Sequence, residues 1–233
     1  MSGKREVARA GGAWGAFRAD VIAYRRYGAM KNLLLFLAVS VVAGLGDAMA
    51  IMLTFPVMMA MGALLSLAYI DETSGWARLR LTMPVSRVDV IRGRYASVLA
   101  VTAGSILLGA VVALAVSTVV ATVAPDARTS VPDLATLGLG VLTGAGFAVL
   151  VVALDVPLVA RFGVTGGVRA VTAVFVALAM IVIIVGRQGG LDGVIALVSS
   201  WGAWAAGPFA ALVVAVLAAS YALATRLYAG REF

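Results

Sequence analysis

The chain has 233 residues, of which 63% are hydrophobic and only 12% charged, and its 18 Lys and Arg outnumber its 11 Asp and Glu. Soluble domains hold about 45–50% apolar and about 25% charged residues, so a small globule could not bury this apolar surface and the composition predicts an integral membrane protein. The absence of Cys and His excludes disulfides, thiol chemistry, zinc fingers and haem attachment, and removes the usual general base.

The first predicted element is an amphipathic helix over about 12–28. Apolar side chains recur there every three or four residues and so share one face of a helix, while arginines lie elsewhere around it. These apolar residues are Trp14, Phe17, Val21 and Tyr24. Such a helix is expected to lie in the membrane surface before the first span. The alternative is a helix that packs on other protein.

Six apolar segments follow, and a helix needs about 20 residues to cross roughly 30 Å of hydrocarbon. The predicted spans are 29–44, 48–70, 96–123, 134–159, 168–185 and 208–227, with an outer turn at 44–47. All Lys and Arg except Arg128 and Arg187 fall on the side of the N-terminus, so both termini are predicted to be cytoplasmic. The predicted fold is a single all-α transmembrane domain over 1–233, with six spans preceded by the interfacial helix.

Methionines crowd the second predicted span. Flexible thioether side chains suit a path that must accept varied apolar cargo. Met52, Pro56 and Met59 are therefore candidate path-lining residues. Ordinary packing or contact with lipid is the alternative.

The segment 71–95, DETSGWARLRLTMPVSRVDVIRGRY, is the longest polar connection on the predicted cytoplasmic side. Pro84 can open a helix there, because proline is tolerated in the first turn. Ser86 can cap the helix, with Asp89 three residues later in a position like that of a capping box. The pattern predicts a short helix at the cytoplasmic surface.

An apolar ridge is predicted along this short helix. Val85, Val88 and Ile91 follow at three-residue spacing, and such a ridge could fit a groove on another protein. Three arginines remain for phosphates, lipid or a partner, namely Arg87, Arg92 and Arg94. The alternative is a positive-inside anchor with no partner.

Asp155 lies in an apolar segment near the inner end of the fourth span. A buried carboxylate is costly there unless it is paired, which makes it a candidate functional residue. Arg161 and Arg169 are the candidate partners in an ion pair at a cytoplasmic gate. A substrate or proton site is the alternative.

Two stretches of the chain resemble ABC-2-type transporter permeases of the small six-span peptide- and drug-exporter branch. The first is 71–95, in which an acidic start, a Trp, a Pro-Val-Ser-Arg core and a basic approach to the next span are typical of that family. The second is LDVPLVARFGVTGGVRAV at 154–171. Asp155 departs from the family pattern, since an acidic residue is not expected just before Pro157.

The resemblance implies the permease subunit of an ATP-binding-cassette exporter in a bacterial cell membrane, moving amphipathic peptides, drugs or lipids by alternating access. A separate cytoplasmic ATPase subunit would hold ATP and Mg. No catalytic residue, metal or cofactor is therefore expected in this chain, which also lacks the G-x-x-x-x-G-K-[ST] phosphate loop. A second permease chain, identical or related, would complete the path. Lipid is a further partner, and nucleic acid is not expected.

The resemblance also implies that segment 71–95 contacts the ATPase through a coupling helix at 84–90. The implied coupling residues are Asp71, Glu72, Trp76, Pro84, Val85, Ser86, Arg87, Val88, Asp89 and Val90. Two alternatives stay open. One is a membrane docking or sensor module that transports nothing. The other is a secondary transporter, which the lack of an internal repeat disfavours.

Overall fold

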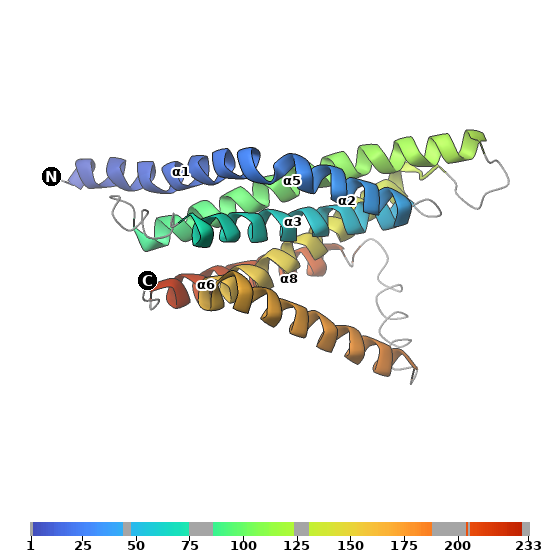
Figure 1. Cartoon of the computed structure of the whole chain (residues 1–233). Coiled ribbons are helices and arrows are strands. Elements are labelled where there is room, and N and C mark those ends of the chain that lie inside the picture. Colours follow the sequence, from blue (N-terminus) through green and yellow to red (C-terminus); the bar gives the residue numbers. More distant parts are fainter. Residues whose placement is uncertain are drawn as a thin grey trace.

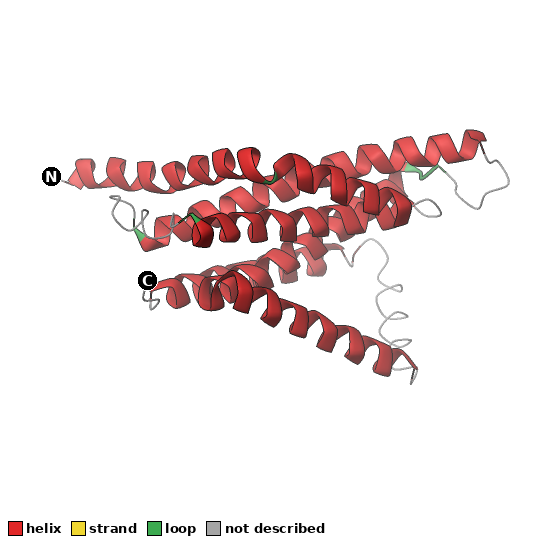
Figure 2. Cartoon of the chain, viewed as in Figure 1, coloured by secondary structure: helices red, strands yellow, loops and turns green. Residues whose placement is uncertain are grey.

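The computed structural model describes residues 2–43, 48–74, 86–123, 131–187, 204 and 206–229. These ranges are almost entirely helical, and no strand occurs in them (Figure 2). The helices are α1 (Ser2–Tyr27), α2 (Ala29–Ala43), α3 (Ala48–Thr73), α5 (Arg87–Val123), α6 (Leu134–Arg187) and α8 (Ala206–Ala229). A helix satisfies its backbone hydrogen bonds internally, which lipid requires of any segment that crosses it.

Four helices are long and apolar enough to cross a membrane, and α2 is a shorter apolar helix. The four candidate spans are Ala50–Thr73, Arg87–Val123, Leu134–Val174 and Ala206–Tyr228. α6 has 54 residues and reverses direction at Gly163, so its two arms run in opposite directions (Figure 1). α2, α3, α5, the two arms of α6 and α8 together correspond to the six predicted spans. The predicted turn at 44–47 lies outside the described residues.

The reversal in α6 depends on the backbone of Gly163, which has φ 72° and ψ −169°. Residues with a Cβ atom essentially never adopt this conformation. Glycine therefore lets two predicted spans follow each other with no intervening loop.

α1 and α2 form one nearly continuous rod along the bundle (Figure 1). Helical hydrogen bonding passes through Gly28, whose N–H donates to Tyr24 O at 2.9 Å and whose carbonyl accepts from Asn32 N at 2.9 Å. The rod packs against α5 and α3, with α1 contacting mainly α5 and α2 contacting mainly α3. α1 thus packs on other helices of the same chain, and its position relative to the membrane surface stays a prediction.

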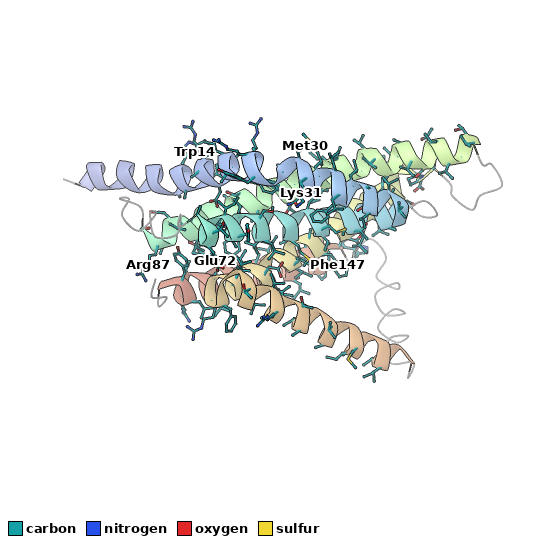
Figure 3. All side chains as sticks on the ribbon, viewed as in Figure 1. Trp14, Met30, Lys31, Glu72, Arg87 and Phe147 are labelled. Carbon is teal, nitrogen blue, oxygen red and sulfur yellow. The ribbon has the colours of Figure 1, made fainter. Side chains whose placement is uncertain are left out.

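The packed face of α1 differs from the predicted one. Residues at every fourth position are buried, in the stripe Gly12, Ala16, Asp20, Tyr24 and Gly28. Trp14, which was predicted to share the apolar face with Tyr24, is 59% exposed and points away from the bundle (Figure 3). Gly12 and Ala16 lie on the packed face because small side chains let α1 approach α5 closely.

α3 is the central helix of the bundle and makes its most extensive contacts with α6 and α5. Its buried face carries large apolar side chains that are almost fully covered, among them Ile51, Phe55, Leu64 and Leu67. The main core also takes in residues of α1, α5, α6 and α8.

A proline in α3 explains its close approach to α6. Pro56 has no N–H, so the carbonyl of Met52, four residues earlier, loses its helical donor. Gly144 of α6 packs directly on that carbonyl, at a distance that leaves no room for a Cβ atom. Met52, Pro56 and Met59, the predicted path-lining residues, are all buried in this single chain. Their role in lining a path stays a prediction.

Candidate functional site

The start of α5 is capped by its own side chains. Asp89 N donates to Ser86 Oγ at 3.1 Å, and the Ser86 hydroxyl donates to Asp89 Oδ2 at 2.6 Å. These bonds satisfy helix-terminal groups that would otherwise lack partners. The predicted cap at Ser86 is therefore confirmed. The helix does not stop after a turn, however, but continues without interruption into the span.

The predicted apolar ridge is only partly exposed. Val88 is 38% exposed and Arg87 is exposed, whereas Ile91 is 4% exposed and belongs to the core. Asp89 and Val90 are buried as well. The ridge prediction is wrong at Ile91, because α5 is already packed into the bundle there. Trp76, Pro84 and Val85 lie outside the described residues.

Arg94 is the centre of a buried ionic cluster that joins three helices. Its Nε lies 3.2 Å from Asp20 Oδ2 of α1, and its Nη2 donates to Asp71 Oδ2 of α3. The side chains of Arg94 and Asp20 are 8% and 0% exposed. Arg94 was predicted to be available for phosphates, lipid or a partner, and this prediction is wrong. Pairing to two carboxylates is what makes burial of the guanidinium tolerable.

Small residues bring α1 and α5 together around this cluster. Gly93 of α5 faces Ala16 and the backbone of Phe17, with too little space for a Cβ atom. Gly12 of α1 faces the carboxyl group of Asp89. α1 and the first turns of α5 are thus in direct contact next to the Arg94 ion pairs, on the side of the helix N-termini.

Glu72, at the end of α3, binds the start of the second arm of α6. Its Oε1 accepts a hydrogen bond from Val164 N at 2.6 Å, immediately after the reversal at Gly163. Free N–H groups and a partial positive charge mark a helix N-terminus, so a carboxylate is favourable there. Figure 3 shows Glu72 and Arg87 at the same end of the bundle.

α8 is bound to α5 and α6 by a short polar chain. Tyr95 OH and Ser220 Oγ are 2.6 Å apart, and Ser220 Oγ also donates to Ala153 O at 2.5 Å. Closer to the start of α5, Arg92 Nε donates to Tyr221 OH at 2.9 Å. We call the region of these contacts the polar end of the bundle. It comprises Asp20, Asp71, Glu72, Ser86, Asp89, Arg92, Arg94, Tyr95, Val164, Ser220 and Tyr221.

Asp155 is not part of the predicted gate ion pair. It is 1% exposed, and its Oδ1 has no hydrogen-bond partner among the described residues. Arg161 and Arg169 are both exposed, and within the described ranges neither forms an ion pair with Asp155. Their side chains lie on the surface near the reversal, whereas Asp155 lies inside the bundle.

Sequence patterns missed the Arg94 cluster, because its members come from three separate segments. One signal could have found it: an acidic residue, Asp20, occurs at four-residue spacing among the uncharged residues Gly12, Ala16, Tyr24 and Gly28. No group of three acidic side chains suited to a metal ion occurs in the described part of the chain. The observed arrangement is a set of ion pairs and hydrogen bonds that joins α1, α3, α5, α6 and α8.

Comparison with protein families agrees with this geometry. The family model described as "ABC-2 family transporter protein" matches residues 17–229. Neither the curated proteins nor the solved structures gave a match. The match covers every helix of the bundle, from within α1 to the last residue of α8. The chain therefore belongs to the ABC-2 family of transporter proteins.

Proposed function

We propose that the chain is the permease subunit of an ATP-binding-cassette exporter, and that a cytoplasmic ATPase subunit docks at the polar end. One observation carries the proposal. The first turn of α5 exposes Ser86, Arg87 and Val88, while Arg94, two turns later, is fixed to α1 and α3. An exposed tip on a rigidly held helix is what a partner needs in order to move the bundle.

A force applied at Ser86–Asp89 would be transmitted along the backbone of α5 and through the ion pairs of Arg94, with no intervening loop. Since Arg94 pairs with Asp20 and Asp71, a displacement of α5 carries α1 and α3 with it. The other proposed coupling residue on α3, Glu72, extends the path to the second arm of α6. We propose that ATP-driven movement of the partner reorients these helices and gives alternating access.

The beginning of α1 and the end of α8 lie at the same end of the bundle as the start of α5 (Figure 1). This supports placing both termini in the cytoplasm, on the side where basic residues concentrate. The proposed location is a bacterial cell membrane. ATP and Mg would bind the partner subunit, and a second permease chain, identical or related, would complete the path. The proposed cargo is an amphipathic peptide, drug or lipid.

A co-purification experiment tests the proposal. The tagged chain is isolated in detergent from its native host, and the eluate is assayed for ATPase activity. Val88→Glu places a charge on the exposed tip of α5 without disturbing the buried Val90 and Ile91. Val131→Glu is the matched control, because Val131 is 49% exposed and precedes α6, at the opposite end from the start of α5 (Figure 1).

We expect an ATPase to co-purify with the wild type and with Val131→Glu, and at least a tenfold lower amount with Val88→Glu. All three proteins should elute as single peaks in size-exclusion chromatography. A wild-type protein that is well folded but brings down no ATPase would contradict the exporter proposal and favour a docking or sensor module.

A further inference from the structure

α3 and the first arm of α6 run side by side. Gly144 meets Met52, and Val164 binds Glu72, and the members of each pair are 92 residues apart. The first contact lies near the start of α3 and the second at its end, just past the reversal of α6 at Gly163, so α3 and the first arm of α6 run in the same direction. Counted along the two helices from Gly144 and Met52, the same offset of 92 residues places Asp155 beside Ala63 of α3, which is 0% exposed.

Helical periodicity directs Asp155 toward α3. It lies eleven residues after Gly144, about three turns of helix, and therefore on the same face as that glycine. Apolar residues make up the rest of this face and of α3 at the same level. They are Ala148, Val152 and Val159 of α6 and Met59, Ala60 and Ala63 of α3, all buried.

A carboxyl group in such surroundings lacks the partner that burial normally demands. Its Oδ1 has no hydrogen bond within the described ranges, and the nearest arginines in sequence are exposed. The other buried acids, Asp20 and Asp89, contact arginines directly. Within the described ranges, Asp155 thus differs from them in having no cation beside it, although an intramembrane acid is costly without one.

We propose that Asp155 binds the cationic group of an amphipathic cargo, with the methionines and small apolar residues of the α3–α6 seam holding its apolar part. This inference rests on the proposed transport function and names the substrate class. A flexible thioether such as Met59 can adapt to varied apolar shapes. The carboxylate supplies the electrostatic selection that an apolar seam lacks.

The seam is closed in this structure, so cargo reaches Asp155 only when α3 and α6 separate. Glu72 is placed to control that separation, because its bond to Val164 N closes the seam at the polar end. On the other side of α6, Ala153 is bound to α8 through Ser220. The first arm of α6 therefore stays with α8 when the seam opens, and Asp155 faces the opening.

Equilibrium binding to the full chain in lipid nanodiscs tests the proposal. The probe is radiolabelled tetraphenylphosphonium, an apolar cation, and neutral triphenylphosphine oxide is its uncharged counterpart. Empty nanodiscs correct for partition into lipid. Asp155→Asn keeps the shape of the side chain and removes its charge, and Asp155→Glu keeps the charge. Ser40→Ala is the matched control, since Ser40 is also fully buried with no hydrogen-bond partner for Oγ in the described chain.

We expect saturable binding of the cation by the wild type and by Ser40→Ala, at least tenfold weaker binding by Asp155→Asn, and partial recovery in Asp155→Glu. Binding of the neutral compound should be the same in all variants. Equal cation affinity in Asp155→Asn, or no saturable binding by the wild type, would overturn the proposal. The assay contains no ATPase, so its failure is distinct from loss of ATPase co-purification, which tests the permease function itself.

Discussion

The two ends of the bundle are held together by different interactions. At the polar end, charged and hydroxyl side chains join helices that are distant in sequence, with Arg94 bound to both Asp20 and Asp71. At the other end, which we call the apolar end, Ile51, Met52 and Ala113 form a small core and Gly144 packs on the Met52 carbonyl.

This difference has a mechanical meaning. Ion pairs and hydrogen bonds have a preferred geometry, so we expect the polar end to move as a unit when α5 is displaced. Apolar surfaces packed through small residues have no such directionality and can slide or separate at lower cost. An applied force at the start of α5 is therefore expected to deform the apolar end more than the polar end.

The largest effect is expected from removing the charge at the centre of the polar end. Arg94→Leu leaves Asp20 and Asp71 buried without their cation, which should lower the free energy of unfolding by about 3–5 kcal/mol. Arg92→Leu is the control, because Arg92 is 58% exposed and ion pairs of exposed side chains contribute little to stability. Thermal unfolding in detergent compares the two variants. An equal decrease in melting temperature for the two variants would contradict the larger structural role of Arg94.

A smaller loss of stability is expected from adding one methyl group at the apolar end. Gly144→Ala pushes a Cβ atom into the Met52 carbonyl, and overpacking of this kind costs about 1–3 kcal/mol. Gly138→Ala, two turns earlier in α6, meets open space and should keep or slightly raise stability. If melting temperatures show the two variants to be alike, α3 and α6 do not pack as closely as described.

The smallest effect concerns Asp133, the exposed cap at the start of α6. Thr136 N donates to Asp133 Oδ1 at 2.8 Å, and hydrogen bonding to Thr136 lowers the pKa of Asp133. Because the folded pKa lies below the unfolded one, the cap stabilises the protein above the unfolded pKa and loses this effect as pH falls through the folded pKa. Asp133→Asn should therefore reduce the fall in melting temperature between pH 6 and pH 3. An unchanged pH dependence would exclude a contribution from this cap.

The helical architecture could be predicted because it depends on local patterns in the sequence. A run of apolar residues specifies a span wherever the rest of the chain lies, and the cap at Ser86 needs only residues within one turn. The reversal at Gly163 was predicted only as a break between two spans. Its single-residue form depends on a backbone conformation that a sequence pattern does not reveal.

The pairing of side chains could not be predicted in the same way. Asp20, Asp71 and Arg94 meet only because α1, α3 and α5 pack together, and each residue alone is typical of a solvated cytoplasmic surface. Asp155 was predicted to pair with arginines close to it in sequence. The helix instead turns its carboxyl group inward and the arginines outward.

The rod formed by α1 and α2 also sets the depth of the ionic cluster in a bilayer. From Asp20 to the end of α2 at Ala43 the rod measures about 35 Å, slightly more than the roughly 30 Å of hydrocarbon in an average membrane. Under the proposed orientation, with the rod from Asp20 to Ala43 crossing that layer, Asp20 and Arg94 would lie at the level of the lipid headgroups. A bilayer a few ångströms thicker would draw the cluster toward the hydrocarbon, so hydrophobic mismatch acts directly on the helices that the partner is proposed to move.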